Sequence, residues 1–124
     1  MAAAKDLPVY KVAYDLLGVI LSAVRNMPRD VKQLVGGPLT KEAMDIVVLI
    51  FRANSTTNKV PYLTDLLERI EVINLLLRLA HDMKMITTKP YAAAIQRTDM
   101  VGKQVGGWRK QQSASSPAAP RSWP

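Results

Sequence analysis

Apolar side chains recur at three- and four-residue steps along most of this chain, which is the period of an amphipathic α-helix. The first such segment follows Pro8, a residue type favoured in the first turn of a helix, and ends at Met27, just before Pro28. Polar residues such as Lys11 and Asp15 lie off its apolar stripe. The pattern predicts a helix over 8–27 whose buried stripe is Val9, Val12, Ala13, Leu16, Leu17, Ile20, Leu21 and Val24.

Three more segments show the same period. One begins near Thr40, which we expect to cap a helix, and continues to Asn54. Its run 46–51 is rich in β-branched residues, but no neighbouring segment offers a partner strand, so we expect a helix there too. The other two helices are expected over 62–85 and from 87–90 to 110. The stretches 28–38 and 55–61, which contain proline, glycine and polar residues, are expected to connect them, and a helical turn at 31–35 is an open alternative within the first.

Four helices of about 20 residues, each about 30 Å long and joined by short connectors, predict an all-α fold, an up-down-up-down four-helix bundle. The bundle is expected to occupy residues 8–110. Residues 1–7 are expected to be a flexible N-terminus. Residues 111–124 are rich in Ser, Ala and Pro without an apolar period, so we expect a disordered tail.

The segment 62–85 carries two apolar faces. One is the ordinary core stripe, which includes Leu63, Leu66, Ile70, Ile73 and Leu77. The other lies roughly opposite and consists of Val72, Leu75, Leu76, Leu79 and Met83. A single bundle does not bury both faces of one helix. Either other parts of the same domain cover the second face, or it is an interface between subunits, and the pattern favours the interface.

Composition narrows the class of protein further. The 124 residues include no cysteine and only 6% aromatics, which favours an aliphatic helical interior over a β-sandwich and excludes disulfides and thiolate metal sites. The longest apolar run is six residues, far short of the ~20 that a membrane helix needs. The basic residues before the first apolar stretch are balanced by acidic ones, unlike those of an export signal. We therefore expect a soluble, cytoplasmic protein without membrane contact.

Candidate catalytic groups are scarce. His81 is the only histidine, and Asp82, its neighbour, points about 100° away from it on a helix, so the two do not form a dyad. The Glu-x-x-His pairs of di-metal bundles are absent, and Gly36-Gly37 lacks the rest of a phosphate loop. Solvated surface positions explain Glu68 and Glu71 better than paired catalytic carboxylates. The sequence predicts no enzyme activity, no metal and no cofactor.

The net charge of +7 is concentrated near the C-terminus. Up to Met83 the chain has ten basic and nine acidic residues; from Lys84 onward it has seven basic residues and only Asp99 against them. One interpretation of this basic excess is a solvated surface, but such surfaces usually mix basic and acidic residues. The excess favours contacts with phosphates, which are salt-sensitive and independent of base sequence. With Arg78, the candidate binding residues are Lys84, Lys89, Arg97, Lys103, Arg109 and Lys110.

Five short motifs, in this order and spacing, resemble one family. They are Tyr-Asp-Leu-Leu at 14–17, Met-Pro-Arg-Asp-Val-Lys at 27–32 leading to Gly36, Arg-Ala-Asn-Ser at 52–55, Leu-Arg-Leu-Ala-His-Asp-Met-Lys at 77–84, and Gly-Lys-Gln-Val-Gly-Gly-Trp at 102–108. The chain is similar, over about 9–110, to the accessory variability determinant proteins of diversity-generating retroelements. These are relatives of the four-helix-bundle proteins encoded by intervening sequences in ribosomal RNA genes.

The resemblance implies a homopentameric ring of bundles with a basic surface that binds the reverse transcriptase of the element and nucleic acid, RNA or DNA. It implies a non-catalytic role in mutagenic retrohoming, in which an error-containing copy of a template RNA replaces a variable region. Arg78 matches a family arginine associated with the basic surface. Asn74 stands where the family commonly has a basic residue, so weight shifts to Lys84, Lys89, Arg97 and Lys103. Gln33 stands where the family has an aromatic after the basic residue of the first connector, so the family's packing at that corner does not carry over.

Two alternatives to this function remain open from the sequence. The first is a stand-alone bundle of the intervening-sequence type. The second is an adaptor that binds an acidic protein through the same basic residues and binds no nucleic acid.

Overall fold

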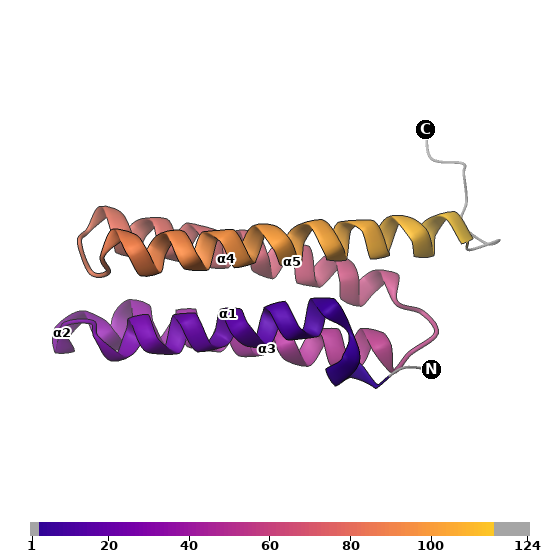
Figure 1. Ribbon diagram of the computed structural model, residues 1–124, viewed down its shortest axis with the longest axis horizontal. Coiled ribbons are helices and arrows are strands. Elements are labelled where there is room, and N and C mark those ends of the chain that lie inside the picture. Colours follow the sequence, from indigo (N-terminus) through magenta and orange to yellow (C-terminus); the bar gives the residue numbers. More distant parts are fainter. Residues whose placement is uncertain (1–2, 116–124) are drawn as a thin grey trace.

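The computed structural model describes residues 3–115, which fold into four long helices (Figure 1). In chain order the elements are η1 (Ala4–Asp6), α1 (Pro8–Arg25), α2 (Arg29–Val31), η2 (Lys32–Gly36), α3 (Gly37–Asn54), α4 (Val60–Asp82) and α5 (Thr88–Ser115). The described residues contain no β-strand.

The four long helices form an up-down-up-down bundle. α1 packs against α3 and α5, and α4 packs against the same two helices, so α1 and α4 lie diagonally across the bundle (Figure 1). The predicted all-helical four-helix bundle is confirmed.

Prolines fix where the long helices begin. Pro8 is the first residue of α1, Pro38 and Pro61 are the second residues of α3 and α4, and Pro90 is the third of α5. A proline in the first turn loses nothing, because the N–H groups there have no partner within the helix. α3 therefore begins ahead of the predicted start at Thr40. The Thr40 hydroxyl does not cap the helix but donates back to the Gly36 carbonyl at 2.9 Å.

The stretch 28–38, predicted to be a connector, is almost entirely helical. A single turn, α2, leads into the π-helix η2, which runs directly into α3. Gly36 closes η2, and a Cβ at this position would lie 2.7 Å from Cγ1 of Val24 in α1. Glycine thus permits α1 and the start of α3 to approach closely at this corner.

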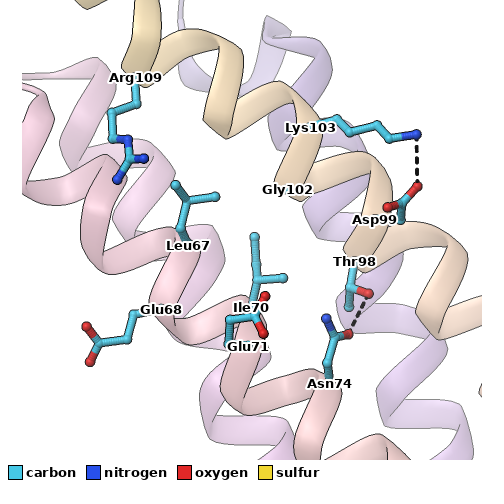
Figure 2. A pocket seen from close by; sticks show the side chains of 10 residues that line it. All are labelled: Leu67, Glu68, Ile70, Glu71, Asn74, Thr98, Asp99, Gly102, Lys103 and Arg109. Atoms are coloured by element: carbon cyan, nitrogen blue, oxygen red, sulfur yellow. Dashed lines mark hydrogen bonds and ion pairs between the residues drawn. The ribbon is translucent and has the colours of Figure 1, made fainter. Parts of the chain in front are cut away.

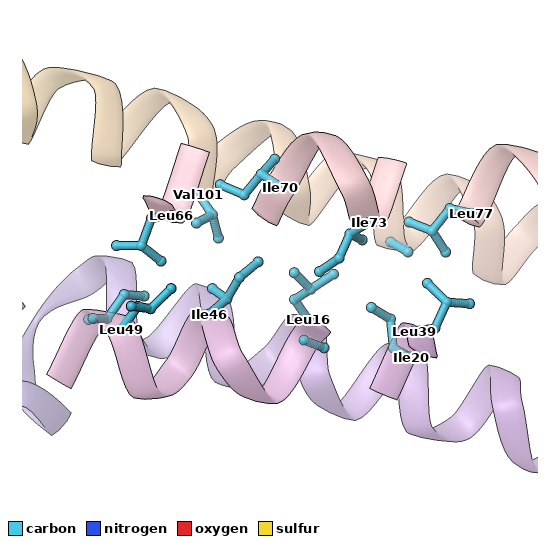
Figure 3. Packing of buried hydrophobic residues seen from close by; sticks show 14 of the residues in the cluster. Leu16, Ile20, Leu39, Ile46, Leu49, Leu66, Ile70, Ile73, Leu77 and Val101 are labelled. Atoms are coloured by element: carbon cyan, nitrogen blue, oxygen red, sulfur yellow. The ribbon is translucent and has the colours of Figure 1, made fainter. Parts of the chain in front are cut away.

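The core combines one stripe of each of the four long helices (Figure 3). The core stripe predicted for α4 is buried, and on α5 Ala94, Thr98, Val101 and Val105 are buried while Trp108 packs partly against the core. Part of the predicted stripe of α1 was wrong: Leu21 is 42% exposed, while Leu17 and Val24 are only half-buried. Side chains labelled in Figure 3 that meet between the helix pairs are Leu16, Ile20, Leu39, Ile46, Leu49, Leu66, Ile70, Ile73, Leu77 and Val101.

The ends of the chain differ from the predicted boundaries. Residues 111–115, assigned to the tail by composition, continue α5 as helix, and 116–124 lie outside the described residues. Near the N-terminus, Ala4–Asp6 form one 3-10 turn before α1. No helix within 3–115 has both the length and the apolarity needed to cross a membrane.

Candidate protein and nucleic-acid interfaces

The second apolar face of α4 points away from the bundle. Leu75, Leu79 and Met83 are 67%, 45% and 62% exposed. Val72 is half-buried at the edge of this face, and Leu76 packs partly against the core. We call these five residues the α4 ridge. Within residues 3–115 nothing covers its three exposed members, so the bundle leaves the face predicted to be an interface open to a partner.

A second apolar surface, which the sequence analysis missed, lies between α1 and α3. We call it the α1–α3 groove, and it consists of Tyr10, Tyr14, Leu17, Leu21 and Val24 from α1 with Met44, Val47, Val48 and Phe51 from α3. A cavity of about 480 Å³ lies between Tyr10 and Phe51 at one end, and another of about 480 Å³ lies between Val24 and Met44 at the other.

Aromatic residues gather at one end of this groove. The rings of Tyr10 and Tyr14 stack with centroids 6.4 Å apart, and Phe51 is 57% exposed beside Tyr10. The spacing of the α1 members, 10, 14, 17, 21 and 24, repeats every seven residues beside the core stripe. This second repeat is the signal that separates the groove from the core, and the sequence analysis merged the two.

Three of the candidate basic residues lie near the turn between α4 and α5. Arg78, Lys84 and Lys89 are exposed, and their side chains have no hydrogen-bond or ion-pair partner among residues 3–115. Lys84 has a left-handed backbone (φ 59°), and the following Met85 N–H donates to the Ala80 carbonyl at 2.8 Å, which ends α4. The turn therefore displays unneutralised positive charge.

Two other candidates are neutralised by neighbours. Nε of Arg97 lies 2.6 Å from the Asp15 carboxylate of α1, and Nζ of Lys103 lies 3.2 Å from that of Asp99. Arg109 is half-buried and Lys110 is exposed near the far end of α5. A rise of 1.5 Å per residue places Lys110 roughly 30 Å along the helix from Lys89. The structure thus places three of the seven candidates near the α4–α5 turn and two near the far end of α5. The other two, which are in ion pairs, lie between these ends.

The connector adds basic residues to one of these ends. α2 and η2 lie at the same end of the bundle as the turn between α4 and α5 (Figure 1). Arg29 is exposed and Lys32 half-buried there. These residues are about 50 positions from the turn in sequence, so their shared location depends on the fold.

A polar pocket of about 560 Å³ lies between α4 and α5 (Figure 2). At its base the Thr98 hydroxyl, on a side chain only 1% exposed, is 2.7 Å from Oδ1 of Asn74 and 2.9 Å from the Ile95 carbonyl. Asn74 therefore binds Thr98 across the helix pair instead of Arg78 along α4. Both acidic and basic side chains line the rim, namely Glu68, Glu71, Asp99, Lys103 and Arg109.

Within 3–115 no three His, Cys, Asp or Glu side chains gather closely enough to hold a metal ion. The ring of His81 stacks on Tyr91 with centroids 4.2 Å apart, and its Nε2 lies 3.1 Å from the Thr88 hydroxyl. These contacts tie the end of α4 to the start of α5.

Ion pairs join α3 to α4. Arg69 Nη1 lies 3.2 Å from each carboxylate oxygen of Glu42, and Nε lies 3.3 Å from Asp65. The hydrogen bond and the charge of Glu42, followed by the charge of Asp65, raise the pKa of the Arg69 guanidinium. On α3, the hydrogen bond to Asp45 and the charge of that carboxylate raise the pKa of Lys41. These cations stay paired and are not available to a partner.

A family model described as bAvd-like matches residues 9–112, which is most of the chain. The chain belongs to the bAvd-like family. This match confirms the resemblance to accessory variability determinant proteins that the motifs indicated. It spans α1 to all but the last turn of α5, so the α4 ridge and the basic turn both lie within the family region. No curated protein sequence matches the chain.

Proposed function

We propose that this protein is a non-catalytic accessory subunit that binds a retroelement reverse transcriptase and nucleic acid during mutagenic retrohoming. The observation that carries the proposal is the bAvd-like match across the bundle. The family resemblance implies two kinds of partner, the reverse transcriptase and RNA or DNA. It also implies assembly into a homopentamer. The unpaired basic residues at the α4–α5 turn support phosphate contacts, and the exposed α4 ridge supports assembly.

Charge reversal at the turn tests nucleic-acid binding. The variant Lys84→Glu/Lys89→Glu is expected to lose affinity for a 20-nucleotide single-stranded oligonucleotide. The slope of the logarithm of its binding constant against the logarithm of the salt concentration should become shallower by roughly one for each phosphate that the variant no longer neutralises. The reason is that each neutralised phosphate releases about one counterion. Fluorescence anisotropy across a salt series measures both quantities, and circular dichroism checks that the variant is folded.

A matched variant controls for net charge. Lys5→Glu, compared with the single turn variant Lys84→Glu, lowers the charge by the same amount at the other end of the bundle, where Lys5 is exposed and is not a candidate binding residue. We expect it to bind more tightly than the turn variant. Equal losses in the two variants would mean that only total charge matters, and a wild type without affinity for the probe would favour the adaptor alternative.

The polymerase partner is tested through Arg78. The protein is expected to co-elute with the reverse transcriptase encoded beside it and to raise cDNA synthesis from the template RNA. Arg78→Glu should reduce both effects while the mass of the assembly stays unchanged, because this side chain is exposed and unpaired among the described residues. Synthesis that is the same with and without the protein would contradict the proposed role.

A further inference from the structure

The two uncovered apolar surfaces have complementary shapes. The α4 ridge is one row of side chains on a single helix, whereas the α1–α3 groove lies between two helices and is hollowed at both ends. Ridge residues 72, 76, 79 and 83 and groove residues 10, 14, 17 and 21 follow the same three- and four-residue steps. Side chains with this spacing on one helix fit between those of a facing helix pair.

The charges beside the two surfaces are also complementary. Three exposed carboxylates flank the α4 ridge within seven residues of Leu75 or Leu79, and none has an ion-pair partner within 3–115; they are Glu68, Glu71 and Asp82. The exposed Arg78 lies on the same flank, which is therefore acidic on balance. Three exposed cations, likewise unpaired in the described chain, lie three or four residues from groove members Tyr14, Leu21 and Val48; they are Lys11, Arg25 and Arg52.

We propose that the α4 ridge of one copy packs into the α1–α3 groove of the next copy, with the acidic flank of the ridge beside the basic rim of the groove. This inference rests on the self-assembly included in the proposed function and names the two surfaces that meet. α1 and α4 lie diagonally across the bundle, so each copy uses two different sides. Such a head-to-tail contact repeats from copy to copy, and it closes into a ring when the rotation between neighbouring copies divides a full turn.

The contact leaves the outer face of α5 and the basic turn free. The exposed side chains of Lys84, Lys89 and Lys110 belong to neither surface. The acidic residues beside the ridge become covered, whereas these lysines stay available in every copy. Assembly through these two faces therefore presents repeated basic surfaces to a polyanion.

Complementation between two variants tests the pairing. Leu79→Glu breaks the ridge and Phe51→Glu breaks the groove, and both side chains are exposed, 45% and 57%, so the fold is expected to survive. Each variant alone should fall to the monomer mass of 13.7 kDa. A 1:1 mixture should form a complex of two copies, because one intact ridge and one intact groove remain to pair. Light scattering at several concentrations measures these masses.

Met100→Glu is the matched control. Met100 is an exposed methionine (42%) on α5 outside both surfaces, so this variant should keep the wild-type mass. Circular dichroism confirms helicity in all three variants.

Other outcomes overturn the pairing in different ways. Dissociation by Leu79→Glu alone, with Phe51→Glu unaffected, indicates contact between two ridges. The pairing is also overturned if both variants are monomeric and their mixture forms no complex of two copies. It is overturned as well if both variants keep the wild-type mass. If the wild type is itself monomeric, the assembly in the proposed function fails as well, whereas the oligonucleotide and polymerase assays test the rest of that function independently.

Discussion

The seam between α1 and α3 and the seam between α4 and α5 join antiparallel helices of one bundle, yet different side chains line them. Apolar and aromatic residues line the first, and Gly36 lets η2 come close to Val24. A hydrogen bond between Asn74 and Thr98 lies at the base of the second, whose rim is charged. Exposure of the apolar side chains of the first seam to water is unfavourable, whereas the charged side chains of the second are readily hydrated. The apolar seam is therefore the side of the bundle that gains from a partner.

Glycine shows the same contrast. A Cβ at Gly36 would meet Val24 at 2.7 Å, but a Cβ at Gly102 or Gly106 in α5 would meet nothing within 4 Å. One seam is closely packed at its glycine, and the other has free space. The same substitution should thus have opposite effects at the two seams.

The largest expected effect is that of Gly36→Ala. The added methyl group overlaps the Val24 side chain, so the free energy of unfolding should fall by about 1–3 kcal/mol. Urea denaturation at fixed protein concentration measures the change. Gly37→Ala, where a Cβ meets nothing within 4 Å, is the control and should not destabilise. The second substitution Val24→Ala should recover part of the loss, and no recovery would place the cause elsewhere.

Thr98→Val tests the polar seam. Valine keeps the volume of the buried side chain but removes the hydroxyl that contacts Asn74, so we expect a loss of about 0.5–1.5 kcal/mol in the free energy of unfolding. Thr64→Val, at an exposed position of α4, should change stability by less than this. Equal effects in chemical denaturation would mean that the buried hydrogen bond contributes nothing specific.

The smallest effect, of opposite sign, is expected from Gly102→Ala. Alanine restricts the unfolded chain and favours helix, and the space around Gly102 accepts its methyl group, so the free energy of unfolding should rise by up to about 1 kcal/mol. Thermal unfolding, with the assembly mass measured in parallel, checks this. A lower mass would show that another backbone packs on α5, against the ridge and groove pairing.

The candidate site was predictable only in part. The unpaired basic residues Lys84 and Lys89 follow from the charge distribution, since helix ends and turns face water. The ion pair between Arg97 and Asp15 does not, because 82 positions separate the two residues and only the packing of α5 on α1 joins them. The pair of Lys103 with Asp99 has the four-residue spacing of neighbours on a helix and was visible in the sequence.

Helix boundaries show the same division between local and distant causes. Pro8 and Pro28 bracket α1 closely, because proline acts through the local backbone. The π-helix through 32–36 lies in a stretch predicted as a connector, and the close approach of its Gly36 to Val24 of α1 is not visible in the local sequence. Residues 111–115 are likewise helical because they continue α5, although their composition predicted a disordered tail.

By itself the sequence determined the helical period, the core stripe of α4, the excess of basic charge and the motifs of the bAvd-like family. These features depend on residues close together in the chain. Tertiary structure alone decided which apolar stripe of α1 faces the core and which forms the groove, and which carboxylate distant in the chain pairs with Arg97. Both outcomes depend on the side of each helix that its neighbours cover, and periodicity within one helix does not specify those neighbours.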